Sequence, residues 1–297
     1  MELWIPITIA AAFVQNLRFM LQKHLKGRLS TLGATFARFI FAAPLAAVLV
    51  GVLIGGDMAA LPAMSPRFWA FALLGGVAQI LATAMLVALF SFRNFAVGVS
   101  FSKTETVQAV LFGVLILGEA ASLGAWIGIL VSLLGVILIS VQAGTLTKDS
   151  FLNRATVLGL GSGAAFGIAA VAVRAAAISL DGGDFLLRAA VTLAAVTGLQ
   201  TVIMAVWLRW REVGQISAVI ANWRVAGWVG VTGMLGSLGW FSAMTLQNVA
   251  YVRALGQVEL VFTFAASWFI FRERATRREV SGVVLICLGI VALLLLG

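Results

Sequence analysis

The chain has 297 residues, of which 62% are hydrophobic and 10% are charged, and its formal net charge is +9 at pH 7. A water-soluble domain typically carries about 25% charged residues, so this composition excludes an ordinary soluble protein and predicts one that is solvated by lipid. The positive charge would indicate nucleic-acid binding only if Lys and Arg gathered on one face. Because they lie in short gaps between apolar runs, we expect a bilayer and no nucleic acid as partner.

The sequence offers few groups for catalysis or metal binding. It contains one His and one Cys, and Cys287 lies within an apolar run, so a zinc site and a disulfide framework are excluded. It has no HExxH, P-loop or GxSxG motif, which hydrolases and nucleotide-driven pumps use. We therefore expect no enzyme activity, no metal and no cofactor. A membrane enzyme or scaffold is the alternative from another class, and the matched cluster of acids and histidines that would support an enzyme is missing from the sequence.

Apolar runs separated by charged clusters predict ten transmembrane helices and no soluble domain. One such helix needs about 20 mostly apolar residues to cross about 30 Å of hydrocarbon. The runs lack the alternation of barrel strands, so the predicted fold class is an all-α integral membrane protein. In chain order the predicted spans are Leu3–Leu21, Gly33–Ile54, Phe68–Phe90, Ala96–Leu117, Leu123–Val141, Thr156–Ile178, Phe185–Leu208, Val225–Leu246, Tyr251–Phe271 and Val280–Leu296.

The positions of Lys and Arg predict the orientation of these spans. Short loops that are rich in Lys and Arg are retained on the cytoplasmic side. On the side of the two termini the connections hold Arg67 alone. The opposite side holds Lys23, Lys26, Arg28, Arg93, Lys148, Arg154, Arg209, Arg211, Arg224, Arg272, Arg274, Arg277 and Arg278. Both termini are therefore predicted to face away from the cytoplasm.

The second half of the sequence repeats the first. A shift of 154 residues aligns residues 92–140 with 246–294 without a gap, and a shift of 150 aligns Arg38 with Arg188. Chance likeness between apolar sequences explains Gly matches more easily than Glu matches. Each half has five helices, an odd number, so the second half enters the bilayer in the opposite orientation to the first. We therefore expect two inverted five-helix repeats, residues 1–145 and 152–297. The matched pairs are Asn94 and Asn248, Ala96 and Ala250, Glu105 and Glu259, Glu119 and Glu273, Gly128 and Gly282, and Gly135 and Gly289.

These features resemble those of the EamA branch of the drug/metabolite transporter superfamily. Each half has a glutamate just after its fourth helix and a Gly-containing fifth helix, as in Leu117-Gly118-Glu119 and Phe271-Arg272-Glu273. The resemblance covers essentially the whole chain and implies a transporter of amino acids, other metabolites or drugs. Within the branch, the nearest functional analogy is to the YddG-type exporters of aromatic and other amino acids.

Ionisable side chains inside a bilayer are costly unless they face water, a partner or a substrate, so they are the first candidates for a site. Lys103 and Glu105 lie near the middle of the fourth predicted span, and Glu259 has the matching depth in the ninth. Residues two apart on a helix do not face each other, so we expect Lys103 and Glu105 not to share one cavity. The two carboxylates either line the pathway and bind a substrate ammonium or protons, or they hold the halves together through Lys103, Arg253, Arg38 or Arg188.

Polar residues near the ends and middles of other spans are further candidates. Arg38 and Arg188 could bind a substrate carboxylate, but both lie within a turn or two of a predicted helix start, which favours snorkelling to the interface. The first span offers Gln15 and Asn16, together with Arg18. Such side chains either orient a small polar ligand or form hydrogen bonds between helices.

The third and eighth predicted spans contain the remaining candidates. Gln79 and Thr83 lie in the third predicted span and have the same two interpretations, ligand binding or helix association. Trp240 lies deep in the eighth span among glycines, where packing in the core is favoured over an aromatic wall of the site. In the sixth span, every fourth residue is small, which predicts close helix packing at Gly159, Gly163 and Gly167.

The sequence therefore predicts a transporter that exports small metabolites by alternating access, chiefly amino acids with aromatic or apolar side chains. We expect it in the cell inner membrane as a monomer, because one chain holds both halves of the pseudo-symmetric unit. Its energy would come from a substrate gradient or from proton exchange, since no nucleotide site is visible. The alternative is proton-coupled efflux of drugs or lipophilic cations, which Glu105 and Glu259 with flanking Phe residues would suit.

Overall fold

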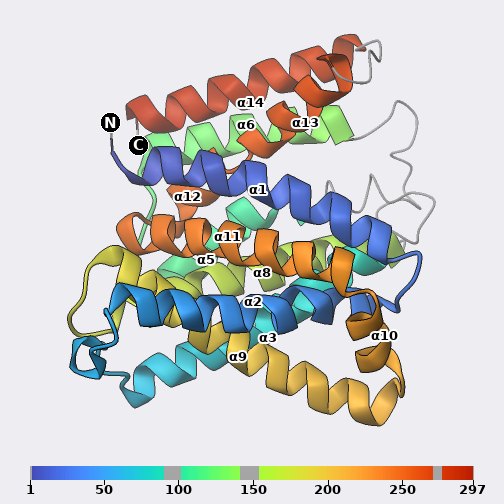
Figure 1. Ribbon diagram of the computed structural model, residues 1–297. Coiled ribbons are helices and arrows are strands. Elements are labelled where there is room, and N and C mark those ends of the chain that lie inside the picture. The colour runs from blue at the N-terminus through green and yellow to red at the C-terminus, as the bar shows by residue number, and fades with distance from the viewer. Residues whose placement is uncertain (1, 90–101, 141–153, 270–275, 297) are drawn as a thin grey trace.

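A computed structural model describes residues 2–89, 102–140, 154–269 and 276–296, and these are helical almost throughout (Figure 1). Within them, an isolated bridge between Ala63 and Asp181 is the β-type pairing. The all-α fold agrees with the apolar runs of the sequence. In chain order the helices are α1 (Trp4–Leu25), α2 (Thr31–Leu53), η1 (Met58–Ala60), α3 (Pro66–Leu89), α5 (Glu105–Leu117), α6 (Leu123–Ser140), α8 (Arg154–Ile178), α9 (Phe185–Arg211), α10 (Gln215–Ala221), α11 (Trp223–Leu246), α12 (Val249–Leu255), α13 (Val258–Phe269) and α14 (Arg277–Leu296).

Several of these helices suit a bilayer. Six of them, α1, α2, α3, α8, α9 and α11, have 22 to 27 residues and are apolar enough to span, while α5, α6 and α14 are apolar but shorter. Val48, Val52 and Leu115 are examples of large apolar side chains that are exposed on the outer helix faces, as expected where the solvent is lipid. Ten spans remain a prediction, because the fourth begins, and the third, fifth and ninth end, outside the described residues.

Helices from the two halves of the chain pack against each other. The main partner of α1 is α11, that of α3 is α8, that of α2 is α9, and that of α6 is α14. By their order within each half, α1 corresponds to α8 and α3 corresponds to α11. Exchanging the halves therefore converts the α1–α11 pair into the α3–α8 pair and leaves the other two pairs unchanged. This is the pattern expected from the pseudo-two-fold axis of the predicted inverted repeat.

Glycines bring α6 and α14 into close contact. A Cβ atom on Gly128 would lie 2.6 Å from the carbonyl oxygen of Gly289, and one on Gly135 would lie 2.5 Å from that of Gly282. Since residue numbers rise along one helix as they fall along the other, α6 and α14 are antiparallel. These glycines are two of the matched pairs of the sequence repeat, and antiparallel packing of corresponding helices is what an inverted repeat requires.

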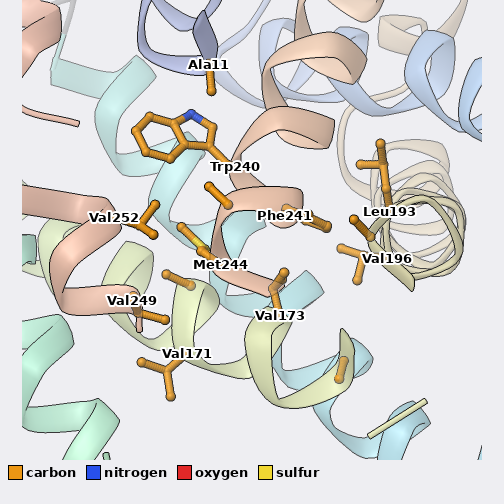
Figure 2. Close-up of a cluster of buried hydrophobic side chains, with 14 of the residues drawn as sticks. Ala11, Val171, Val173, Leu193, Val196, Trp240, Phe241, Met244, Val249 and Val252 are labelled. Atoms are coloured by element: carbon orange, nitrogen blue, oxygen red, sulfur yellow. The ribbon is translucent and has the colours of Figure 1, made fainter. Parts of the chain in front are cut away.

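A cluster of buried hydrophobic side chains connects α11 with its neighbours (Figure 2). Trp240, Phe241 and Met244 of α11 are each at most 5% exposed. The indole of Trp240 lies beside Ala11 of α1 in Figure 2, so α11 joins this core to the polar region next to α1. The cluster is completed from α8, α9 and α12 by Val171, Val173, Leu193, Val196, Val249 and Val252.

Both ends of the chain lie at the same end of the helix bundle (Figure 1). The start of α6 also lies there, because the hydroxyl of Ser122 donates to the carbonyl oxygen of Leu296 over 3.5 Å. The prediction that this end faces away from the cytoplasm depends on the Lys and Arg count alone.

Candidate functional site

The two matched glutamates each lie at the start of a half-helix. The ninth predicted span is divided into α12 and α13, and Glu259 lies in the first turn of α13. In the fourth predicted span a turn at Lys103 and Thr104 precedes α5, whose first residue is Glu105. The shift of 154 residues that aligns the glutamates also aligns these two breaks. Discontinuous helices of this kind form the midplane sites of many secondary transporters.

This break makes one sequence-based prediction wrong. We expected Lys103 and Glu105 to face different surroundings, because side chains two apart diverge on a continuous helix. In the structure Lys103 belongs to the turn and Glu105 to the helix that follows, and both side chains line the same cavity.

Glycines let neighbouring helices pack into both breaks. A Cβ atom on Gly256, between α12 and α13, would lie 2.4 Å from the indole of Trp240. A Cβ atom on Gly163 of α8 would lie 2.9 Å from the carbonyl oxygen of Ser102 and 3.2 Å from the backbone nitrogen of Glu105. Gly163 belongs to the small-residue face that the sequence predicts for the sixth span. Close backbone approach therefore holds each break against a helix of the surrounding bundle.

Two ion pairs connect the half-helices of one half of the chain with those of the other. Arg253 Nη1 of α12 lies 2.9 Å from Glu105 Oε1 of α5, and Lys103 pairs with Glu259 of α13. All four side chains are at most 18% exposed. The carboxylates correspond to each other in the repeat, whereas the cations do not, since the repeat partner of Lys103 is Gln257. Both broken spans are therefore joined electrostatically at the depth of their breaks.

Uncharged residues of α1 hold Glu259, and Trp240 of α11 supports one of them. The side-chain amide of Gln15 donates to Glu259 Oε2 over 2.8 Å, and the amide of Asn16 donates to the main-chain carbonyl of Glu259 over 2.9 Å. The indole N–H of Trp240 donates to Gln15 Oε1 over 3.1 Å. The guanidinium of Arg253 lies 4.9 Å above the ring of Trp240, a cation–π distance. Trp240 therefore has contacts with both core and site, and it orients Gln15.

These groups line a central cavity of about 160 Å³. The four members of the two ion pairs line it together with Gln15 and Trp240, and residues of α1, α3 and α8 complete it with apolar surface, namely Phe19, Leu86 and Phe166. An apolar cavity with a few convergent polar groups is the usual form of a small-molecule site. In the part of the chain that the structure describes, no three His, Cys, Asp or Glu side chains gather as a metal site would require.

The structure separates the two arginines that the sequence repeat aligns. Arg38 is 4% exposed, and its Nη1 and Nη2 donate to the hydroxyls of Thr83 over 3.0 Å and Ser237 over 3.1 Å. The snorkelling that we expected for Arg38 is therefore wrong, because α3 and α11 enclose it. Arg188 is only half-buried, and its Nε donates to the carbonyl oxygen of Gly182 over 3.0 Å, at the start of α9.

A smaller compartment of about 20 Å³ lies next to the central cavity. It shares Gln15, Trp240 and Arg253 with that cavity and is also lined by Arg38. Gln79 lines it as well, and Gln79 Oε1 accepts from the amide of Gln200 over 2.9 Å, which connects α3 with α9. Gln79 is thus placed both at a cavity wall and between two helices.

Two further cationic residues, Arg18 and Arg253, belong to the candidate site, although their local sequence does not distinguish them from other charged residues of the predicted spans. Arg18 is 2% exposed in α1 and lines the smaller compartment, and Arg253 lines both cavities. Each is a charged residue inside a predicted span, which is itself the signal of a functional position. The sequence does not show which groups they meet: Arg253 pairs with Glu105 of α5 in the other half of the chain, and Arg18 donates to Gln15 within α1.

Comparison with known proteins identifies the class of the molecule. Residues 2–141 and 153–295 match the sequence profile of the EamA-like transporter family, one match in each half. The chain belongs to the EamA-like transporter family. It is therefore a multi-pass membrane transporter of the drug/metabolite transporter superfamily and not an enzyme. No curated protein sequence matches this EamA-like chain significantly.

A solved structure of another protein supports the fold. The superposition with that crystal structure covers 99% of this EamA-like chain and 96% of the other chain, with a TM-score of 0.70 and 15% sequence identity. At this identity the likeness shows the fold and carries no information on substrate.

Proposed function

We propose that this EamA-like transporter exports small metabolites that carry both an ammonium and a carboxylate group, chiefly amino acids with apolar or aromatic side chains. The observation that carries the proposal is the pair of ion pairs, Arg253 with Glu105 and Lys103 with Glu259, on the wall of a cavity of about 160 Å³. The wall thus presents both signs of charge within a mostly apolar enclosure, which a zwitterion with an apolar side chain matches.

A zwitterion can exchange partners with these ion pairs without leaving a buried charge unpaired. Its ammonium replaces one cation at Glu105 or Glu259, and its carboxylate then accepts from the released Lys103 or Arg253. An uncompensated charge inside a low-dielectric site is strongly unfavourable. Since each ion pair joins the two halves of the chain, this exchange would couple substrate binding to a relative movement of the half-helices, as alternating access requires.

Efflux of lipophilic cations, the alternative from the sequence, receives less support. Both carboxylates already pair with a cation, so a substrate cation that displaced Lys103 or Arg253 would leave that side chain without a counter-ion. The cavity of about 160 Å³ is also below the roughly 300 to 1,000 Å³ of drug-sized sites.

Efflux from proteoliposomes tests the proposal. Labelled methionine, phenylalanine, tryptophan and threonine are compared with a labelled lipophilic cation, with and without an imposed pH gradient. We expect efflux of at least one amino acid and none of the cation. A pH gradient that accelerates efflux would indicate proton exchange, and one without effect would indicate a facilitator. Efflux of the cation alone would contradict the proposal.

Carboxylate variants test the site itself. We expect Glu105→Gln and Glu259→Gln to lower efflux about tenfold or more, because each removes the negative member of a buried pair. Asp181→Asn, in an exposed connection at one end of the bundle, is the matched control and should retain efflux. Wild-type efflux from correctly inserted Glu105→Gln and Glu259→Gln variants would show that these carboxylates are not part of the site.

A further inference from the structure

The described residues that line the two adjoining cavities carry more positive than negative charge. Four cations line the two adjoining cavities, Arg18, Arg38, Lys103 and Arg253, against the two carboxylates Glu105 and Glu259. The two ion pairs use Lys103 and Arg253. Among the residues that the structure describes, Arg18 and Arg38 have no carboxylate partner, although they are only 2% and 4% exposed.

The present contacts of these two arginines position them without neutralising them. Arg38 donates to the hydroxyls of Thr83 and Ser237, which carry no charge. Arg18 Nη2 donates to Gln15 Oε1 over 3.4 Å, and its buried Nε has no hydrogen-bond partner within the described residues. Buried charges are normally paired, and buried donors are normally satisfied. The compartment therefore lacks an acceptor with negative charge.

A glycine of α11 allows the side chains of Arg18 and Arg38 to lie close to the same stretch of backbone. Gly233 of α11 leaves room for both stems, since a Cβ atom there would lie 3.1 Å from Arg38 Cγ and 3.7 Å from Arg18 Cδ. Arg253 lines the same compartment, so three cationic side chains border it. Like charges are held in one apolar interior only at an energetic cost, which a bound anion would offset.

A side-chain amide, that of Gln79, adds to this positively charged lining. Gln79 Oε1 accepts from Gln200, which turns the NH2 group of Gln79 away from that contact, and Gln79 lines the compartment. Among the described residues that line it there is no carboxylate. Because guanidinium groups bind planar carboxylates with two parallel hydrogen bonds, a carboxylate is the anion that this arrangement fits best.

We infer that Arg18 and Arg38, with Gln79, form a carboxylate-binding subsite beside the central cavity. Its position next to Gln15, Trp240 and Arg253 makes it reachable for the carboxylate of a substrate whose ammonium lies at Glu105 or Glu259. This assignment of the substrate carboxylate rests on the proposed function. A free small carboxylate is the other source of the same chemistry, and it would act as a counter-ion.

Binding to the full-length protein in detergent tests the subsite without any transport. The probes are sodium acetate at constant ionic strength, methionine, methioninamide, which lacks the carboxylate, and 4-(methylthio)butanoate, which lacks the amine. The readout is the midpoint of thermal unfolding as a function of probe concentration. We expect acetate, methionine and 4-(methylthio)butanoate to raise the midpoint, and methioninamide to need about tenfold higher concentration or more.

Variants connect this binding to the two arginines. Arg38→Gln and Arg18→Gln should abolish the effect of acetate, and Ser237→Ala, which removes only a hydroxyl that holds Arg38, should weaken it. Ser237→Ala keeps the test valid if an arginine variant does not fold. Arg188→Gln is the matched control, because Arg188 is the repeat partner of Arg38 but lines neither cavity, and it should respond like the wild-type protein.

Further outcomes distinguish a substrate carboxylate from a free carboxylate as the occupant, and the subsite from the proposed transport function. Competition between acetate and methionine for one site would assign the subsite to the substrate, and additive binding would assign it to a free carboxylate. Acetate binding that depends on Arg38, in a protein that moves no amino acid, would retain the subsite and refute the proposed function. Equal binding of methionine and methioninamide, with acetate inactive on the wild-type protein, would overturn the inference.

Discussion

Arg253 and Glu105 lie 2.9 Å apart, although they are 148 positions apart in the sequence and each belongs to a different half of the chain. The guanidinium of Arg253 also lies above the ring of Trp240, so this pair is held on both sides. Together with Lys103 and Glu259 it places four charged side chains at the two helix breaks.

Reversing this pair should separate its structural contribution from its role in transport. Glu105→Gln or Arg253→Gln alone leaves one buried charge without its partner, which we expect to destabilise the protein by about 3 kcal/mol or more. The double exchange Glu105→Arg with Arg253→Glu should recover part of that stability while efflux stays low, because the charges then face the substrate in the reversed order. Unfolding in detergent and efflux are the two measurements. The double variant Glu105→Gln with Arg253→Gln completes a double-mutant cycle, and stability losses of the two single variants that simply add in it would contradict a direct pair.

Gly163 is expected to be sensitive to a single methyl group. Gly163→Ala places a Cβ atom 2.9 Å from the carbonyl oxygen of Ser102, so the turn before α5 must shift, at about 1–3 kcal/mol of unfolding free energy. Gly198→Ala in α9 is the matched control, since a Cβ there meets nothing within 4 Å, and a helical Gly→Ala change stabilises by about 0.5–1 kcal/mol. Equal unfolding midpoints for the two variants would show that α8 does not pack into the break.

Arg174 connects three elements at the end of the bundle that holds both termini. Its Nε lies 2.9 Å from both carboxylate oxygens of Glu119, and its Nη1 donates to the carbonyl oxygens of Met244 and Gln247. Arg174→Lys keeps the charge but loses the bidentate contact of the guanidinium with Glu119. We expect this to lower the free energy of unfolding by about 1–2 kcal/mol. Arg188→Lys, which loses one contact to a carbonyl oxygen, should change stability less. The order of the two unfolding midpoints decides this prediction.

The orientation of the protein can be tested independently of its substrate. Fusions of alkaline phosphatase, which is active outside the cytoplasm, and of green fluorescent protein, which fluoresces inside it, are placed after the C-terminus. The scarcity of Lys and Arg on the side of the termini predicts an active phosphatase and a dark fluorescent protein. A bright fluorescent protein with an inactive phosphatase would reverse the predicted topology.

The sequence by itself determined the class of this protein, because lipid as solvent demands long apolar runs that composition reveals directly. It also indicated the matched Glu105 and Glu259, since an acid inside a span is costly wherever it lies. The glycines of α6 and α14 were visible as repeat matches too, as close helix contact requires the absence of a side chain.

Only the tertiary structure decided which groups meet. Helix periodicity placed Lys103 and Glu105 on different faces, and the break that unites them depends on α8, whose Gly163 lies at the turn. Likewise, position near a helix start suggested that Arg38 snorkels, whereas Thr83 and Ser237 from distant segments enclose it. The environment of a buried charge is formed by neighbours that are remote in sequence, so local pattern identifies the charge and the packing of the two halves determines its partner.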